Sequence, residues 1–434
     1  MNMREMKETG ISWFPLIPAD WQTGRIKDIL SVLTDYTANG SFGDLAKNVT
    51  YLDYEDYARL VRLTDLRENL KNMGVYVDEN GYSYLSKSSL FGGEILVANV
   101  GAYAGLFCEM PTVDYPATLA PNMFLLRTND VMLQHYLLYV GLSSFVWEQL
   151  CQKAISSAQP KLNKTDVKTT FIPIPPISEQ RRIADYLDIK CAQFDSTISD
   201  IQSQIEALEE YKRSVITEAV TKGIDPDVEM RDSGVQWIGM MPTHWDCQRG
   251  KYILRYVQKP VRDDDGVITC FRDGEVTLRS NRREEGFTMA DKEIGYQGID
   301  VGDLVVHGMD GFAGSIGISD SRGKASPVLN VLDTEQNKRY IMYYLRSMAY
   351  NDVFVALATG IRVRSCDLRW NKLAELLYSI PPIAEQQAIV EHIDSVLERT
   401  NAIIADKKQQ IETIEEYKKS LIFEYVTGKK EVQA

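Results

Sequence analysis

The sequence lacks the features of an exported or membrane-bound protein. Its six cysteines are scattered and form no C-x-x-C pair, a usage typical of reduced thiols rather than of a disulfide framework. No stretch approaches about 18 consecutive apolar residues, and no apolar segment follows the charged residues at the N-terminus. We therefore expect a cytoplasmic protein without a membrane partner.

Motifs for catalysis are missing as well. The four histidines show no metal-ligand spacing with one another or with cysteine, and the phosphate-binding pattern G-x-x-x-x-G-K-[ST] is absent. A methyltransferase acting on exocyclic amino groups would need an Asn/Asp-Pro-Pro-aromatic run, whereas both Pro-Pro pairs here are flanked by isoleucine. We expect no catalytic residue, no metal site and no cofactor bound by this chain.

Positive charge is in deficit, with 48 lysines and arginines against 61 aspartates and glutamates and a net charge of −13. Because phosphate binding is driven largely by Lys and Arg displacing counterions, this balance argues against a nucleic-acid partner. Net charge does not say where the charges lie, however, and an acidic protein can carry a basic surface. The 434 residues, 44% of them apolar, suffice for about two to four domains.

What the sequence does contain is an internal repeat. Residues 174–222 and 380–428 align without a gap at an offset of 206, and 22 of the 49 aligned positions are identical. Both copies open with IPPI-x-EQ and contain EEYK-[KR]-S near their ends. A shorter block before each copy recurs at an offset of 224, so the chain is a tandem duplication. In this block Gly10, Trp13, Pro18, Trp21, Arg25, Lys27, Ile29 and Leu30 return as Gly234, Trp237, Pro242, Trp245, Arg249, Lys251, Ile253 and Leu254.

The long repeated block has the apolar spacing of a coiled-coil helix, with heptad rows interrupted in the second copy by Thr400 and Lys407. A lone stripe of this kind is more often ordinary bundle core. Two copies at matched positions favour two long helices that pair antiparallel, with Ser178 as an N-cap of the first. The residues expected to pair are Leu187, Phe194, Ile198, Ile201, Ile205 and Leu208 in the first helix, and Ile393, Leu397, Ile404, Ile411, Ile414 and Leu421 in the second.

The repeats divide the chain into four parts. These are a first domain with its leading block (1–173), a first helix (174–222), a linker with a second domain (223–379), and a second helix with a tail (380–434). Both domains are predicted to mix strands and helices, and Gly101, Gly105, Gly311 and Gly314 are expected to supply positive φ in turns. The predicted strands are 95–100, 123–128, 171–174, 267–271, 303–307 and 328–332, and the predicted helices are 131–150 and 337–357.

Two basic segments at equivalent positions, 153–168 and 359–374, each carry a local charge of +3 in this acidic chain. They are the best electrostatic candidates for contact with DNA, although a basic solvated loop is the simpler alternative. Arginine is also suited to clamping phosphates and reading guanine edges. The candidate DNA-binding residues are Lys153, Lys161, Lys164, Lys168, Arg362, Arg364, Arg369 and Lys372, with Arg62, Arg67, Arg272 and Arg279, and further Arg282 and Arg283.

These motifs together resemble the specificity (S) subunit of type I restriction-modification systems. The resemblance rests on IPPISEQ and IPPIAEQ, on EEYK-[KR]-S, on DSGVQWIGMMPTHW between the first helix and the second domain, and on the G-[DE]-[IL]-[LV] strand with its glycines. It covers nearly the whole chain in the family's order. It implies an α+β fold of two target recognition domains, separated by two long helices that form an antiparallel coiled coil in a pseudo-two-fold tandem repeat.

The resemblance also implies a function and partners. Each recognition domain would read one half of a bipartite double-stranded DNA site, and the paired helices would set the spacing. Two copies of the modification subunit, which bind S-adenosylmethionine, and restriction motor-nuclease subunits, which use ATP and Mg, are the implied partners. The chain itself is expected to be non-catalytic. The alternative is a coiled-coil assembly adaptor whose variable domains bind proteins.

Overall fold

The computed structural model describes residues 4–154, 160–282, 294–357 and 368–432 of the chain, which divides into two compact units. The first unit contains Met1–Asp200 with Gln409–Ala434, and the second contains Ile201–Lys408. Each unit therefore combines one globular domain with about one half of each long helix. None of the described helices is long and apolar enough to cross a bilayer.

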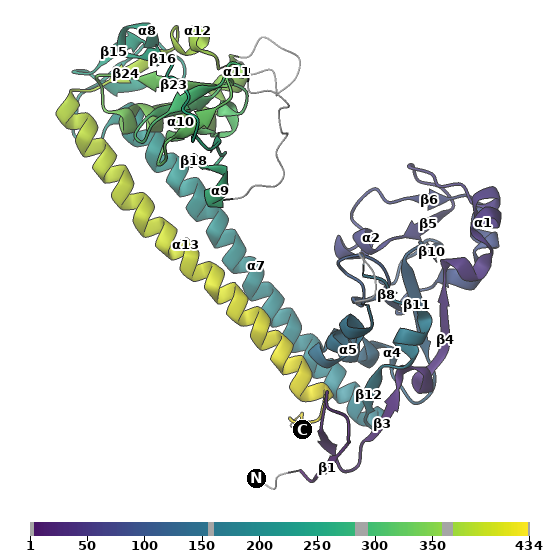
Figure 1. The fold of residues 1–434 in the computed structure, drawn as a ribbon. Helices are drawn as coiled ribbons and strands as arrows, with labels where there is room; N and C mark the ends of the chain where they lie inside the picture. The colour runs from purple at the N-terminus through teal and green to yellow at the C-terminus, as the bar shows by residue number, and fades with distance from the viewer. Residues whose placement is uncertain (1–3, 155–159, 283–293, 358–367, 433–434) are drawn as a thin grey trace. The chain divides into compact units, whose positions relative to one another are not determined.

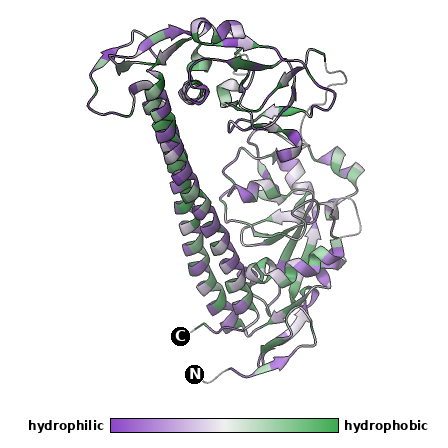
Figure 2. Cartoon of the chain, turned by 60° about the vertical axis from the view of Figure 1, so that its left-hand side comes forward, coloured by the Kyte–Doolittle hydropathy of each residue, from purple (hydrophilic) through white to green (hydrophobic). Residues whose placement is uncertain are grey.

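The two long helices are α7 (Ile177–Lys222) and α13 (Ile383–Val426). In the first unit the start of α7 lies beside the end of α13, with the chain running in opposite directions (Figure 1). Purple and green alternate along both helices in Figure 2, as expected for helices with an apolar stripe and a polar remainder.

Both long helices begin at a Pro-Pro pair. The carbonyl of Pro176 accepts the N–H groups of Glu179 and Gln180 at 2.9 and 3.0 Å, and the equivalent Pro382 carbonyl serves the first turn of α13 in the same way. Ser178 lies inside the first turn of α7. The prediction that Ser178 caps this helix is therefore wrong, because the helix begins one residue before it and the proline carbonyl receives these N–H groups.

An antiparallel four-stranded sheet forms the centre of the domain in the first unit, in the order β4-β11-β8-β9. A second sheet, β6-β5-β10-β7, pairs β5 and β10 in parallel, and two short pairs, β1-β2 and β3-β12, lie near the chain's start. The strands are β1 Met6–Glu8, β2 Leu16–Pro18, β3 Gln22–Arg25, β4 Leu30–Asp35, β5 Ala58–Val61, β6 Tyr76–Val77, β7 Ser89–Leu90, β8 Ile95–Ala98, β9 Phe107–Glu109, β10 Ala117–Leu119, β11 Met123–Thr128 and β12 Phe171–Ile174.

The domain of the second unit has a central antiparallel sheet with equivalent strands in the same order, β16-β23-β20-β21. Its other described strands form four two-stranded pairs: β13-β14, β15-β24, β17-β18 and β19-β22. The strands are β13 Met230–Asp232, β14 Met240–Pro242, β15 Asp246–Arg249, β16 Arg255–Val257, β17 Ile268–Cys270, β18 Val276–Leu278, β19 Gln297–Ile299, β20 Leu304–His307, β21 Ile316–Ile318, β22 Gly323–Ala325, β23 Leu329–Asp333 and β24 Leu377–Ile380.

The shorter helices pack around these sheets. The predicted helix 131–150 is two helices, because Ser143 adopts an extended conformation between α4 and α5. The predicted helix 337–357 is likewise broken where Asp352 takes a left-handed φ of 54° between α10 and α11. The helices are α1 Phe42–Asn48, α2 Leu63–Arg67, α3 Glu79–Tyr84, α4 Gln134–Leu142, α5 Ser144–Ala154, α6 Lys164–Lys168, α8 Gly250–Ile253, α9 Arg279–Arg282, α10 Lys338–Tyr350, α11 Val353–Ala356 and α12 Trp370–Leu373.

The glycines that follow β8 and β20 have the predicted role at three of four positions. Gly101, Gly105 and Gly314 have φ of 87°, 96° and 96°. Gly311 does not have a positive φ, so that prediction is wrong. A Cβ at Gly311 would lie 2.5 Å from Cδ1 of Leu368, so a larger residue here would displace the end of that side chain.

The apolar core of each domain continues into the long helices. In the first unit, Ile183 and Leu187 of α7 and Leu421 of α13 belong to the same buried cluster as the central sheet. In the second unit, Ile216 of α7 and Ile393 of α13 occupy the corresponding cluster. Each domain is therefore built on the end of one long helix and the beginning of the other.

Candidate functional site

The repeated glutamate of IPPI-x-EQ joins each long helix to its domain. Glu179, in the first turn of α7, accepts the indole N–H of the buried Trp21 at 2.8 Å and forms an ion pair with Arg4. In the second unit Glu385 accepts the indole N–H of Trp245 at 3.0 Å. Both pairs are separated by about 140 to 160 positions in sequence, yet the same two residue types meet in each unit.

The glutamine that follows clamps the domain helix. The Gln180 side chain accepts the N–H of Leu133 at 2.7 Å, just before α4 begins, and donates to the carbonyl of Pro175. Gln386 accepts the N–H of Asn337 at 2.9 Å, just before α10, and donates to the carbonyl of Pro381. Both amides are fully buried, so their hydrogen bonds fix the angle at which the domain meets the helix.

A second contact holds the first domain to α7. His135 lies between two carboxylates, with Nδ1 2.8 Å from Glu109 and Nε2 2.7 Å from Asp188. Tyr139, one turn further along α4, donates its hydroxyl to the same Asp188. The hydrogen bond with Glu109, reinforced by Asp188, raises the pKa of His135 to about 9 in spite of partial burial.

The second domain repeats this contact with a different cation. Arg339 of α10 donates to Asp394 at 2.6 Å, and Tyr343 donates its hydroxyl to the same oxygen at 2.6 Å. Asp394 is the residue that aligns with Asp188 in the repeat, at the offset of 206. The sequence repeat therefore marks the acceptors on the long helices, and a tyrosine donor recurs in both domains, whereas the basic donor differs. Sequence reasoning missed this role, because each donor is remote in sequence.

The predicted helix-pairing residues all lie on the less exposed faces of α7 and α13. In the first unit Phe194 packs edge-on against Tyr417 with ring centroids 5.5 Å apart, and Lys418 forms an ion pair with Asp195 at 2.6 Å. In the second unit Lys407 donates to the Gln204 side chain. The twelve residues, each buried or half-buried, are Leu187, Phe194, Ile198, Ile201, Ile205, Leu208, Ile393, Leu397, Ile404, Ile411, Ile414 and Leu421.

Two of the four lysines in the first basic segment are used within the domain. The Lys153 ammonium donates to Thr169, to Thr170 and to the carbonyl of Asp166 at 2.8–3.1 Å, and burial lowers its pKa. Lys164 forms an ion pair with Asp35 at 3.0 Å. The exposed members of the segment are Lys161 and Lys168.

The second basic segment is described only in part. Arg369 and Lys372, at the start of and within α12, are exposed. Arg362 and Arg364 lie outside the described residues, as does Arg283. A matched basic surface on the two domains therefore remains a prediction.

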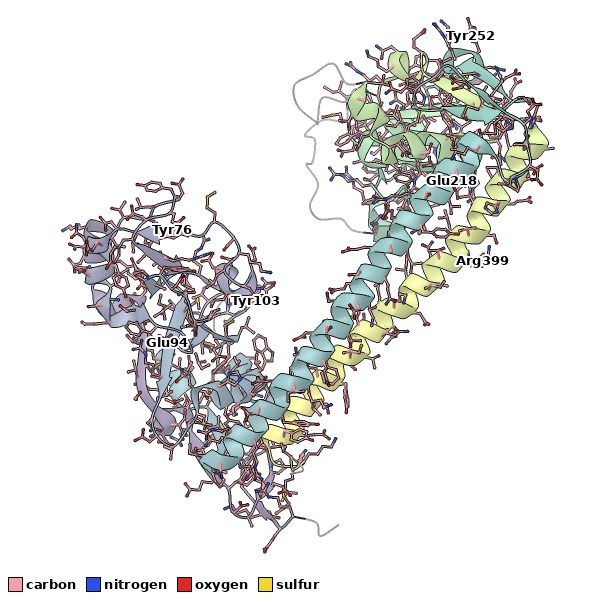
Figure 3. All side chains as sticks on the ribbon, turned by 180° about the vertical axis from the view of Figure 1, so that it is seen from behind. Tyr76, Glu94, Tyr103, Glu218, Tyr252 and Arg399 are labelled. Atoms are coloured by element: carbon pink, nitrogen blue, oxygen red, sulfur yellow. The ribbon has the colours of Figure 1, made fainter. Side chains whose placement is uncertain are left out.

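The two candidate arginines of the first domain differ in their surroundings. Arg62 is held by two hydrogen bonds to the buried carboxylate of Asp65, 2.8 and 3.0 Å long, which raise its pKa. Arg67 is exposed and lies over the ring of Tyr103 at 4.3 Å. Tyr103, labelled in Figure 3, belongs to the loop after β8. Of the two, Arg67 is the one available to a ligand.

In the second domain Arg272, Arg279 and Arg282 line one cavity of about 590 Å³. Arg272 is 64% exposed and forms an ion pair with Asp310 at 3.3 Å, whereas Arg279 donates to the Thr269 hydroxyl at 3.0 Å. No cluster of three potential metal-ligating side chains occurs among the described residues.

The sequence of the chain matches a known family. Residues 18–210 match the family described as the type I restriction modification DNA specificity domain. The resemblance to type I specificity subunits predicted from the motifs is thereby confirmed, and such subunits are non-catalytic components of their complexes.

Similar proteins extend the match over 95% of the chain. The chain is 23% identical to the putative type I restriction enzyme MjaX specificity subunit of Methanocaldococcus jannaschii, over 95% of this chain and 94% of that protein. It is 24% identical to the MjaVIII specificity subunit of the same organism, over 95% and 93% of the two chains.

One solved structure supports the fold. A chain from a study of complex assembly and conformational transition of the type I R-M system matches with a TM-score of 0.65 and 15% identity, over 95% of this chain and 99% of that one. The predicted α+β class, with long helices between strands, is confirmed at this level.

Proposed function

We propose that this chain is the DNA specificity subunit of a type I restriction-modification complex, and that each of its two domains reads one half of a bipartite site. The observation that carries the proposal is the pair of matched junctions at Glu179–Gln180 and Glu385–Gln386. They attach two domains of different sequence to the long helices through the same helix residues. A protein that recognises two half-sites of different sequence needs two different DNA-binding domains held by the same helical scaffold.

In this proposal α7 and α13 form one antiparallel coiled coil that sets the distance between the half-sites. The contacts Phe194–Tyr417 and Gln204–Lys407 support it, because residues further along α7 contact residues earlier in α13, as in an antiparallel pair. The four-part division at 1–173, 174–222, 223–379 and 380–434 follows from it, as does the pseudo-two-fold repeat. The acidity of the chain is acceptable if partner subunits make much of the phosphate contact.

The repeated helix ends offer a surface for two copies of one partner. The EEYK-[KR]-S motif places exposed Tyr211 on α7 and exposed Tyr417 on α13, each 51–53% accessible and surrounded by glutamates. In the second unit the two glutamates of this motif, Glu209 and Glu210, line a hollow of about 740 Å³ beside α7. We assign this surface to two modification subunits, which bind S-adenosylmethionine. Restriction subunits, which use ATP and Mg, complete the cytoplasmic assembly.

The spacing role is tested by lengthening both helices by one heptad, after Ser203 in α7 and after Lys407 in α13. Seven residues add about 10 Å to a helix, or about three base pairs of DNA. The adenine-methylation pattern of cells expressing the variant with the modification subunit should keep both half-sites and show a longer spacer. Insertion of seven residues into the linker 223–229 is the control, expected to leave the spacer unchanged. An active insertion variant with its original spacer would contradict the proposal.

A further inference from the structure

The cavity of about 590 Å³ in the second unit opens between two loops. One is the turn of the β17–β18 hairpin, and the other follows β20 and corresponds to the Gly-rich loop after β8 in the first unit. The cavity combines cationic, anionic and imidazole side chains rather than a single type of charge. The charged and imidazole residues that line it are Arg272, Arg279, Arg282, Asp273, Asp310 and His307.

The hairpin turn that carries Arg272 is rigidly held. Phe271 donates its N–H to the backbone carbonyl of Glu275 at 2.8 Å, and Gly274 donates to the carbonyl of Phe271 at 3.0 Å. From outside the hairpin, the Arg346 guanidinium donates to the carbonyl of Asp273 at 2.7 Å. An exposed side chain on such a turn is positioned before any ligand arrives.

Close backbone packing fixes the turn from behind. A Cβ on Gly314 would lie 2.6 Å from the carbonyl oxygen of Arg272, and a Cβ on Gly317 would lie 1.9 Å from that of Gly274. Glycine at these two positions lets the loop after β20 and strand β21 approach the turn directly. The two walls of the cavity are therefore one packed structure.

His307 organises the opposite wall. Its Nδ1 accepts the N–H groups of Met309 at 3.2 Å and Asp310 at 2.9 Å, so in the neutral ring the proton lies on Nε2. Burial lowers the pKa of His307, which favours that neutral form. The two hydrogen bonds hold the loop so that the Asp310 carboxylate stands 3.3 Å from the guanidinium of Arg272.

The three arginines of the cavity are not equivalent. Arg282 is engaged by Asp273 and Glu275 at 2.7 and 2.8 Å and stacks on Phe271. Arg272 is 64% exposed, and its partner Asp310 is 38% exposed. An exposed ion pair of this kind contributes little and is readily exchanged for a ligand. Of the three arginines, Arg272 is therefore the side chain best placed to reach the edge of a base in a DNA groove.

We propose that Arg272 reads a guanine in the half-site of the second domain, donating two hydrogen bonds to O6 and N7 in the major groove. Arginine on guanine is the commonest specific contact between protein and DNA. The two carboxylates offset two of the three guanidinium charges in the cavity, and Asp310 can accept a hydrogen bond from the amino group of a paired cytosine. The inference rests on the proposed function, because it assumes that this domain reads DNA.

The test uses the chain reconstituted with its modification subunit. The methylated motif of the native complex is mapped first, followed by those of R272A and R272Q, with methylation rates on sites altered at each position of the second half-site. R272A should relax one G·C position, with discrimination falling about 5- to 150-fold for one lost bidentate contact. R272Q should shift that position toward A·T, since Gln pairs with adenine. A changed preference cannot arise from misfolding.

Arg255 supplies the matched control, because it lies in the same domain, is 65% exposed and pairs with Asp333 at 2.9 Å. R255A should leave the motif unchanged. A second half-site without guanine, or an R272A complex with native discrimination, would overturn the inference and leave the bipartite function intact. Equal weakening on all sequences would show a phosphate contact and also overturn it. A native complex that methylates no bipartite site would instead overturn the proposed function.

Discussion

The two domain–helix junctions use the same acceptors on the long helices, but the basic residue that meets each acceptor differs between the domains. Asp188 receives His135 in the first unit, whereas the equivalent Asp394 receives Arg339 in the second. A carboxylate accepts either cation with similar geometry, so the domain can change while the helix does not. The repeated helix sequence thus supplies the acceptor that stays the same in both contacts.

The glutamate contact uses arginine and histidine in the opposite arrangement. Glu179 pairs with Arg4 in the first unit, whereas Glu385 pairs with His244 at 2.8 Å in the second. Each unit therefore carries one arginine and one histidine at its junction, in exchanged positions. Among the contacts that both junctions share is a buried tryptophan that donates to the glutamate.

The largest effect is expected from the shared tryptophans. Trp21 and Trp245 are 0% and 1% exposed, so replacement of either by alanine should cost about 3–5 kcal/mol of unfolding free energy. Hydrogen exchange should show the loss mainly in the unit that carries the change. W21F and W245F keep most of the packing and lose the N–H donor, and should cost less. Equal loss of protection in both units would contradict independent junctions.

The shared aspartates should have the next largest effect. Asp188→Ala and Asp394→Ala each leave a nearly buried tyrosine hydroxyl, on Tyr139 or Tyr343, without its acceptor. The expected cost is about 1–3 kcal/mol in each unit, measured by urea unfolding. Asp185→Ala, on the exposed face of α7, is the control and should change stability by less than about 0.5 kcal/mol. An effect no larger than the control would show that these hydroxyls do not depend on the carboxylate.

The sequence predicts the long helices well, because the heptad spacing of apolar residues and the helix-starting prolines are signals that depend only on neighbouring residues. The Pro-Pro pairs mark where α7 and α13 begin, and 123–128 and 171–174 have the predicted strand bounds. The breaks at Ser143 and Asp352 are not predicted, because neither position carries a proline or glycine and each break depends on tertiary packing.

The candidate site was less predictable than the fold. Charge counting treats all lysines alike, yet Lys153 turns inward to carbonyl and hydroxyl groups and Lys164 pairs with Asp35. The junction glutamates were visible as a repeated motif, but their partners lie about 140 to 160 positions away. The one sequence signal for this contact is that both residues recur in both halves of the chain, the glutamates at an offset of 206 and the tryptophans at an offset of 224.

A moderate effect is expected where the two helix repeats differ. Phe194 contacts the Tyr417 ring, whereas its equivalent Thr400 is 4% exposed and donates its hydroxyl to the carbonyl of Val396 at 2.8 Å. F194A should cost about 1–2 kcal/mol through lost packing. T400V should be neutral or slightly stabilising, because the hydroxyl bonds only within its own helix. Similar losses for both variants in urea unfolding would show that the two positions are equivalent.

The smallest effect concerns pH, where the exchanged cations differ most. Hydrogen bonding to Glu109 and Asp188 raises the pKa of His135 to about 9, from about 6.5 in the unfolded chain. A raised pKa stabilises the folded form fully below about pH 6.5, and this stabilisation is lost as pH rises through about 9. Because the ring is 39% exposed, we expect roughly 1 kcal/mol or less. Arg339 stays charged over this range, so the second junction should not weaken.

The control for this effect is His135→Arg, which gives the first junction the cation of the second. Urea unfolding followed separately in the two units, from pH 6.5 to 9.5, should show the first unit losing stability in the native chain and retaining it in H135R. Glu109→Gln removes the carboxylate that contributes most to the raised pKa of His135 and should move the transition to lower pH. Persistence of the same pH dependence in H135R would assign it to another group, because arginine cannot lose its proton in this range.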